Sequence, residues 1–284
     1  MSATPYFPGL QFDMKFDLHR GSDPDLGEAE EEFRDKDLRR HIRQRDGYRC
    51  VSCGVALFSP SAEEGDSAAG LELHHMDGDH HNNSPSNIIS LCPLCHCILH
   101  IGKSVYLHWA EKAMRVIWFP WLSQEELNLL TWTMAVAIFR SELPDADDAA
   151  TEVGGKARSL ARYLCGQTDL PEDFLPDAGI RDKFMLRVMQ RSQDSGAVRG
   201  PHPVRYLCDI LIKVRSLDAK LYNERSRWLG GLRIFFDPQS PMLFTTPDGS
   251  TLVDRMSASS HWAAGESWSD AWRAISEQFA TDRV

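Results

Sequence analysis

Cysteines and histidines gather between residues 50 and 100 of this chain, and their spacing is that of metal ligands. Two Cys-x2-Cys pairs, Cys50/Cys53 and Cys92/Cys95, stand at the two ends of the segment. Four thiolates in a tetrahedron suit a closed, structural zinc site. A disulfide pair is the alternative, but such pairs in a chain without a secretory signal favour zinc.

Two adjacent histidines, His74 and His75, follow an alternating run between the cysteine pairs. Neighbours on a strand point to opposite faces, so one can bind a metal while the other acts as a base. If residues 93–101 form a helix, His96 and His100 lie on one face of it. Together with His74 they would make a three-imidazole site with open positions, as a catalytic metal needs.

Each of these residues also has a purely structural interpretation. His74 alone suits a core histidine, His96 a companion of the neighbouring cysteine, and Asn87 a turn or cap residue. Their joint spacing is what favours chemistry.

The whole pattern resembles the HNH (ββα-metal) endonuclease motif, from Asp37 to Lys103. The resemblance is carried by the lead-in L-R-R-H-I-R-Q-R-D-G-Y-R-C, the His-His pair, the turn D-G-D-H-H-N-N and the closing N-I-I-S-L-C-P-L-C-H. It implies a DNA endonuclease whose cysteines hold a structural zinc apart from the catalytic metal.

The resemblance also implies a role for each residue of the central site. His75 would be the general base that activates water, and Asn87 would hold its imidazole in orientation. His74 and His96 would bind a catalytic divalent ion such as Mg, Mn, Ni or Zn. His100 would be the third ligand or a phosphate contact. The fold can persist without the activity, so nuclease function is a separate expectation.

A second resemblance lies downstream. An aromatic strand, Met114 to Trp121, precedes L-S-Q-E-E-L-N and an apolar helix that we expect from Ser123, with Glu126 completing a capping box, to Arg140. This is similar to IcmJ/DotN proteins, type IVB secretion components that use an HNH-like zinc fold for assembly. It implies the alternative of an adaptor without nuclease activity. Its partner would be a coupling ATPase, docked through the 124–140 helix or the C-terminal unit.

These elements predict an α+β fold in four parts. An N-terminal part, 1–35, holds a strand over Leu10–Leu18 and an acidic loop; the zinc module with its following strand and helix spans 36–141; an acidic linker spans 142–155; and a mainly helical unit spans 156–284. Further expected elements are a helix at 37–46, a mobile insertion at 59–70, helices at 156–165, 181–191, from Pro203 and at 267–279, a strand at 233–236 and a turn at 247–250.

The chain carries a formal net charge of -10, which argues against a coat of nucleic acid over its whole surface. Residues 180–233 are the exception, with 12 Lys and Arg against 5 Asp and Glu. We expect phosphate contacts there, and a solvated helix surface is the alternative. The candidate contacts are Arg205, Lys213, Arg215 and Lys220.

No apolar run is long enough to cross a membrane, so we expect no membrane insertion. The seven cysteines include three beyond the two pairs, and we expect those three to be reduced. Both features favour a cytoplasmic protein.

Overall fold

A computed structural model describes residues 36–57, 70–79, 81–100, 113–119, 122–165, 202–225, 229 and 231–240. In these ranges the chain combines helices with two small antiparallel sheets, an α+β arrangement as expected. The expected elements that lie outside the described residues are the strand at 10–18, the helices at 181–191 and 267–279, the turn at 247–250 and all but the last residue of the insertion at 59–70.

The lead-in helix, α2 (Lys36–Arg45), is hydrogen bonded to the segment that carries the histidines. Its apolar residue Ile42 is fully buried, and the helix is followed by two residues with positive φ, Gly47 and Tyr48. Arg43 donates to the carbonyl of Leu71, and Arg45 donates to the carbonyl of Ile88. The basic residues of α2 thus hold the β1–β2 hairpin by its backbone.

That hairpin consists of β1 (Glu72–His75) and β2 (Ile88–Leu91), followed by α3 (Pro93–Leu99). The strands pair antiparallel, with His74 opposite Ile89, and a short 3-10 turn, η2 (Pro85–Asn87), leads into β2. Cys92 is the N-cap of α3, and its sulfur accepts from the backbone N–H of Cys95. The helix ends two residues earlier than expected, which leaves His100 as its C-cap.

The apolar helix, α5 (Gln124–Ser141), has the expected capping box between Ser123 and Glu126. Most of its residues are buried and the others are partly buried, and Trp132 and Met134 have no exposed surface. A helix that is apolar on every side needs cover on every side, and here the chain itself provides it. Burial within the chain therefore accounts for the apolar character of α5 without a docked partner.

A second sheet joins residues far apart in the sequence, in the order β4-β3-β5. Its strands are β3 (Met114–Trp118), β4 (His202–Pro203) and β5 (Leu232–Phe236), all antiparallel. The strand expected at 233–236 is confirmed, one residue longer. Ile234, Phe235 and Phe236 are fully buried in it.

The acidic segment expected as a linker at 142–155 is helical from Asp148 onward, as part of α6 (Asp148–Leu164). Asp147 caps this helix by accepting from the backbone N–H of Ala150. Acidic residues at a helix start stabilise its dipole, so the charges that suggested a linker instead begin a helix. The division of the chain into separately folding units stays a prediction.

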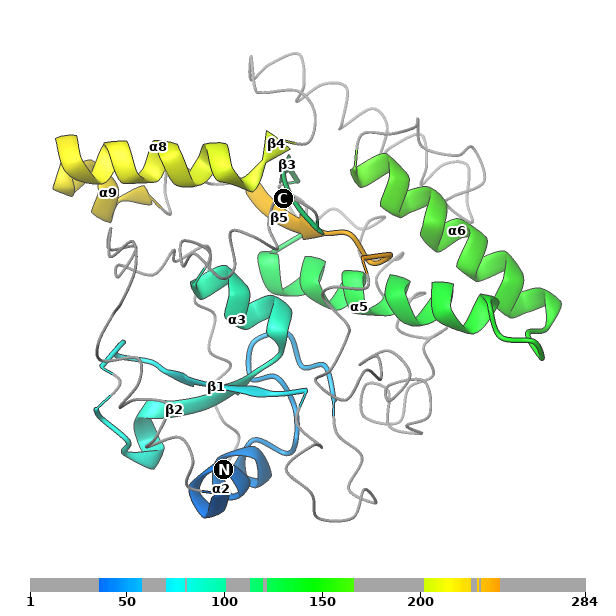
Figure 1. The fold of residues 1–284 in the computed structure, drawn as a ribbon, viewed down its shortest axis with the longest axis horizontal. Coiled ribbons are helices and arrows are strands. Elements are labelled where there is room, and N and C mark those ends of the chain that lie inside the picture. Colours follow the sequence, from blue (N-terminus) through cyan, green and yellow to red (C-terminus); the bar gives the residue numbers. More distant parts are fainter. Residues whose placement is uncertain are drawn as a thin grey trace.

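Helix α6 runs alongside α5 (Figure 1). The contact is close because Gly154 has no side chain: a Cβ there would lie 2.2 Å from Cβ of Ser141.

The helix expected from Pro203 is α8 (Val204–Leu217), and a separate short helix, α9 (Ala219–Asn223), follows it. The expected apolar stripe is only partly buried. Leu207 and Leu211 pack into the core, whereas Ile210 and Leu217 are 51% and 86% exposed. Leu221 lies in α9 and not in α8, because Asp218 ends the stripe by capping a new helix at Ala219. No helix within the described residues has the length and apolar character needed to cross a membrane.

Candidate functional site

The four cysteines meet in one buried cluster, as their spacing predicted. None of the four forms a disulfide bond, so the disulfide alternative is wrong. The sulfurs of Cys53 and Cys92 lie 3.7 Å apart, and a tetrahedron with zinc–sulfur bonds of about 2.3 Å has edges of about 3.8 Å. The donor set and this spacing fit a tetrahedral metal ion such as zinc.

Ionisation of all four cysteines in this buried cluster would depend on a bound cation. Burial raises the pKa of the Cys53 and Cys95 thiols well above the usual range, and hydrogen bonding and charge from Cys50 raise both further. Cys50 changes in the opposite direction: burial acts to raise its pKa, but hydrogen bonds from the other three sulfurs lower it well below the usual value. Several thiolates cannot stay ionised together in a buried site without a positive ion, so metal binding and ionisation are linked.

The second cluster consists of His74, His96 and His100, whose ligand atoms all lie within 4.8 Å of one another. The ring centroids are 5.4 Å apart for His74 and His96, 5.1 Å for His74 and His100, and 4.5 Å for His96 and His100. Nδ1 of His74 and Nε2 of His100 are 3.1 Å apart. Three imidazoles at these separations can hold a divalent transition metal.

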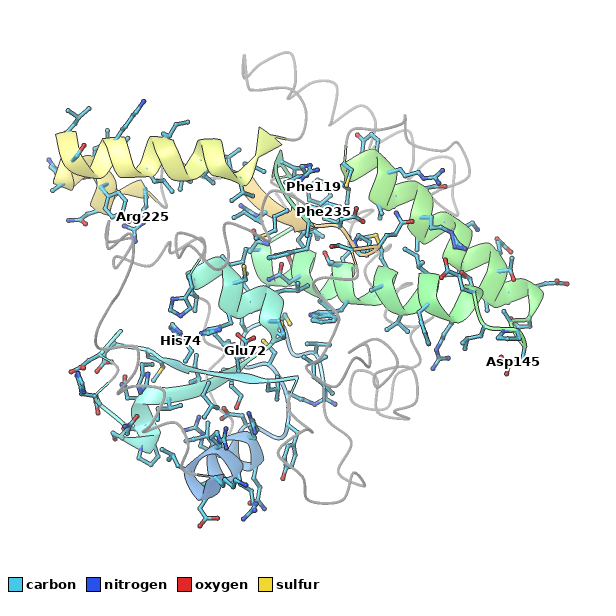
Figure 2. The ribbon with its side chains drawn as sticks, viewed as in Figure 1. Glu72, His74, Phe119, Asp145, Arg225 and Phe235 are labelled. Carbon is cyan, nitrogen blue, oxygen red and sulfur yellow. The ribbon has the colours of Figure 1, made fainter. Side chains whose placement is uncertain are left out.

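Glu72 is a member of this cluster that the sequence reasoning did not include. It lies two residues before His74 in β1, and Figure 2 shows both on the side of β1 that faces α3. Nδ1 of His96 donates to its carboxylate. Burial acts to raise the pKa of Glu72, but the hydrogen bond to His96 and the charges of His96 and His100 together hold that pKa below its ordinary value. The alternation of strand residues is the signal that could have found it.

His75 is only 3% exposed and comes next after His74 in β1. Its Nε2 lies 2.9 Å from Oδ1 of Asn83, in the turn that joins the two strands. The amide in contact with His75 is therefore that of Asn83, whereas the sequence suggested Asn87. Asn83 belongs to the D-G-D-H-H-N-N run, but sequence spacing alone does not say which amide of that turn folds back onto the strand.

Asn87 instead holds the turn together. Its amide oxygen accepts from the backbone N–H of Asp77 at 3.1 Å, and its Nδ2 donates to Oδ1 of Asp77 at 2.8 Å and to the carbonyl of Asn82 at 3.0 Å. The backbone N–H of Met76 donates to its carbonyl. Hydrogen bonds from Asn82, Asn87 and the backbone of Asp79 lower the pKa of Asp77 to about 2.

The expected nucleic-acid contacts lie elsewhere, on α8 and α9. Lys213 and Lys220 are exposed there, and the side chains of Arg205 and Arg215 lie outside the described residues. A role in phosphate binding stays a prediction for all four.

Comparison with known proteins locates a relative for one part of the chain. No family model matches. A stretch of 60 residues is 38% identical to a protein named "H-N-H endonuclease F-TflIV" from Escherichia phage T5, and it covers 20% of this chain. The match spans about a quarter of that relative's length, 24%. One segment of this chain is thus similar to a phage HNH endonuclease, the family that the cysteine and histidine spacing indicated.

Proposed function

We propose that this chain is a metal-dependent endonuclease that hydrolyses DNA phosphodiester bonds. The observation that carries the proposal is the convergence of three imidazoles beside β1, with a fourth histidine, His75, next in the same strand. The similarity of one segment to a protein named as an HNH endonuclease supports the same reading. The order of hairpin and helix, β1-β2-α3, suits an HNH module.

His75 is the proposed general base, and its surroundings favour one tautomer. The Oδ1 atom of Asn83 can only accept a hydrogen bond, so it requires the proton on Nε2 of His75. Nδ1 then keeps its lone pair and can take a proton from water. Asn83 fixes the ring in this state, which is the orienting role expected of Asn87.

His74, His96 and His100 are the proposed ligands of the divalent ion. When bound, such an ion offsets the negative charge of the phosphodiester and of the leaving oxygen. Glu72 accepts the Nδ1 proton of His96, which leaves Nε2 of that ring to bind the metal. Three nitrogen ligands favour Ni or Zn over Mg, which prefers oxygen ligands.

The cysteine cluster is the proposed structural zinc site, separate from the reaction. Its four cysteine residues are at most 9% exposed, and a closed tetrathiolate leaves no position for a substrate. The exposed residues Lys213 and Lys220, with Arg205 and Arg215, are the proposed contacts to the DNA backbone.

Cleavage of plasmid DNA by the full chain tests the proposal. The protein is loaded in turn with Ni²⁺, Zn²⁺, Mn²⁺ and Mg²⁺, and compared with His75→Ala and with a control in the exposed turn, His81→Ala. We expect nicking by the parent and by His81→Ala, and a rate lower by about 10²–10⁴-fold in His75→Ala, because general base catalysis contributes that much. Thermal melting and metal content of His75→Ala should match the parent.

Folded, metal-loaded protein that cleaves neither supercoiled, linear nor single-stranded DNA would overturn the nuclease. That result would favour the adaptor function, in which the fold is retained for assembly. Its docking surface would then lie outside α5, which is buried in the chain.

A further inference from the structure

Helix α5 directs two N–H groups at the cysteine cluster. Nδ2 of Asn128 donates to the sulfur of Cys95 at 3.2 Å, and Nε1 of Trp132 donates to the sulfur of Cys92 at 3.4 Å. The two donors are four residues apart, so they lie one turn apart on the same face of α5. Both side chains are buried, at 1% and 0% exposure.

These bonds are expected for thiolates rather than thiols. A neutral thiol is a weak acceptor, whereas an ionised acceptor forms a much stronger hydrogen bond. Burying an amide and an indole N–H against weak acceptors would lower stability. The placement of Asn128 and Trp132 therefore fits sulfurs that carry charge, as metal-bound thiolates do.

The orientation of Asn128 is itself fixed by a buried neighbour, Gln124. Nε2 of Gln124 donates to Oδ1 of Asn128 at 2.9 Å and to the carbonyl of Ile234 at 2.8 Å. The backbone N–H of Ile234 donates back to Oε1 of Gln124 at 2.8 Å. Because Oδ1 of Asn128 is engaged by a donor, Nδ2 is the atom that faces Cys95. The chain of hydrogen bonds runs from β5 through α5 to the cysteine cluster.

We propose that Asn128 and Trp132 are part of the metal site of the cysteines, and that Gln124 positions Asn128 for it. The donors stabilise the charge on Cys95 and Cys92 and slow loss of the metal. The same bonds link the order of α5 and β5 to the presence of metal. This inference rests on a metal at the cysteines, as in the proposed function, and not on nuclease activity.

Cobalt(II) is the probe for the test, because a tetrathiolate cobalt centre absorbs light by sulfur-to-metal charge transfer. The full chain is loaded with Co²⁺ as the parent and as Trp132→Phe, Asn128→Leu and Gln124→Leu. The control is Thr133→Val, also buried in α5, whose hydroxyl donates only to the carbonyl of Leu129. Absorption spectra and the rate of metal transfer to a chelator are measured on protein that circular dichroism shows to be folded.

We expect the charge-transfer bands of Trp132→Phe and Asn128→Leu to move to longer wavelength, because a thiolate without its donor gives up an electron more easily. Metal affinity should fall roughly 10- to 100-fold, the usual effect of removing a group that hydrogen bonds to a metal ligand. Gln124→Leu should show a smaller change in the same direction, and Thr133→Val none.

Spectra and release rates of Trp132→Phe that match those of Thr133→Val would overturn the inference. Phenylalanine keeps most of the volume of the indole and lacks its N–H. Trp132→Phe therefore tests the proposed donor role even if Asn128→Leu does not fold. A chain that takes up no Co²⁺ at the cysteines would overturn the inference as well. A chain that binds and responds as expected but cleaves no DNA leaves the inference standing and contradicts only the nuclease.

Discussion

The cysteine cluster and the histidine cluster both draw ligands from the β1-β2-α3 segment, to which Cys50 and Cys53 add the loop after α2, but their surroundings differ. All four cysteines are buried, whereas two of the three histidines, His74 and His96, are only partly buried. The cysteines are part of the larger apolar core and receive donors from α5. In the histidine cluster, His96 contacts the carboxylate of Glu72, whose side chain is 40% exposed. A closed site suits stability, and an accessible one suits a metal that must meet a substrate.

The largest expected effect is the loss of folding on removing a ligand from the cysteine cluster. Cys92→Ser removes a ligand that also caps α3 and accepts two N–H groups, from Cys95 and Trp132. Because metal binding to such a site is coupled to folding, we expect loss of the metal and of the cooperative melting transition. Circular dichroism and metal analysis measure both.

Cys97→Ala is the matched control for that variant. Cys97 is equally buried in α3 but contacts the sulfur of Met114 instead of the cluster. Its loss should cost about 1 kcal/mol, a common value for a single substitution, and leave metal content unchanged. A Cys92→Ser chain that melts like Cys97→Ala would contradict the structural role of the cysteine site.

The second-largest expected effect is the loss of metal and of cleavage on changing the histidine cluster. His100→Ala should remove one divalent ion per chain and reduce cleavage at least 10²-fold, because the ligand set drops to two imidazoles. The ion at the cysteines should remain, since none of its ligands changes. Metal analysis after dialysis separates the two sites. Loss of both ions together would show that the clusters do not act independently.

A smaller effect distinguishes the two asparagines of the hairpin turn. Asn83→Ala removes the hydrogen-bond acceptor of His75. It should lower kcat by about 10-fold, the usual effect of removing a group that orients a functional side chain, with little change in the melting temperature. Asn87→Ala breaks three side-chain hydrogen bonds around Asp77 and Asn82. It should cost about 1–3 kcal/mol of stability. Thermal melts and steady-state kinetics on both variants give the comparison.

The reverse pattern would contradict these roles and return the orienting function to Asn87. A kcat unchanged in Asn83→Ala, with a large loss of kcat in a stable Asn87→Ala chain, is that outcome. Equal small effects from both variants would show that His75 needs no orienting amide.

Local spacing carried the most reliable predictions from sequence. Each Cys-x2-Cys pair brings its two sulfurs together over a single turn. The sequence therefore predicted the four-cysteine cluster, in which the pair Cys50/Cys53 meets the pair at the start of α3. His96 and His100 are four apart at the end of one helix, which brings them together with little help from the rest of the fold. The capping box of Ser123 and Glu126 fixed the start of α5 in the same way.

Sequence patterns did not specify the features that depend on residues distant in the chain. The amide that reaches His75 depends on the path of the turn, which a run of two asparagines does not specify. The pairing of β3 with β5 joins residues more than a hundred positions apart, and no local pattern encodes it. The acidic residues of 142–155 suggested a linker, whereas Asp147 caps α6 and Gly154 gives this helix its close approach to α5.

The smallest expected effect tests the asymmetry within the cysteine site. Among the described residues, Cys92 accepts N–H bonds from Cys95 and Trp132, Cys95 from Asn128, and Cys50 from Cys53. No described N–H group donates to the sulfur of Cys53. Cys53 is also the most exposed of the four sulfur residues, at 9%.

A thiolate without donors keeps more electron density on sulfur, so Cys53 should react first with an electrophile. Limited treatment of the folded, metal-loaded chain with N-ethylmaleimide, followed by peptide mass analysis, should find the first adduct there. The preference should be a few-fold, because exposure differs little among the four. First modification at Cys92 would mean that its two donors do not protect it, and the proposed role of Trp132 would lose its support. Trp132→Phe sharpens the comparison further: removing that one N–H should raise the reactivity of Cys92 toward that of Cys53 and leave Cys50 as it was.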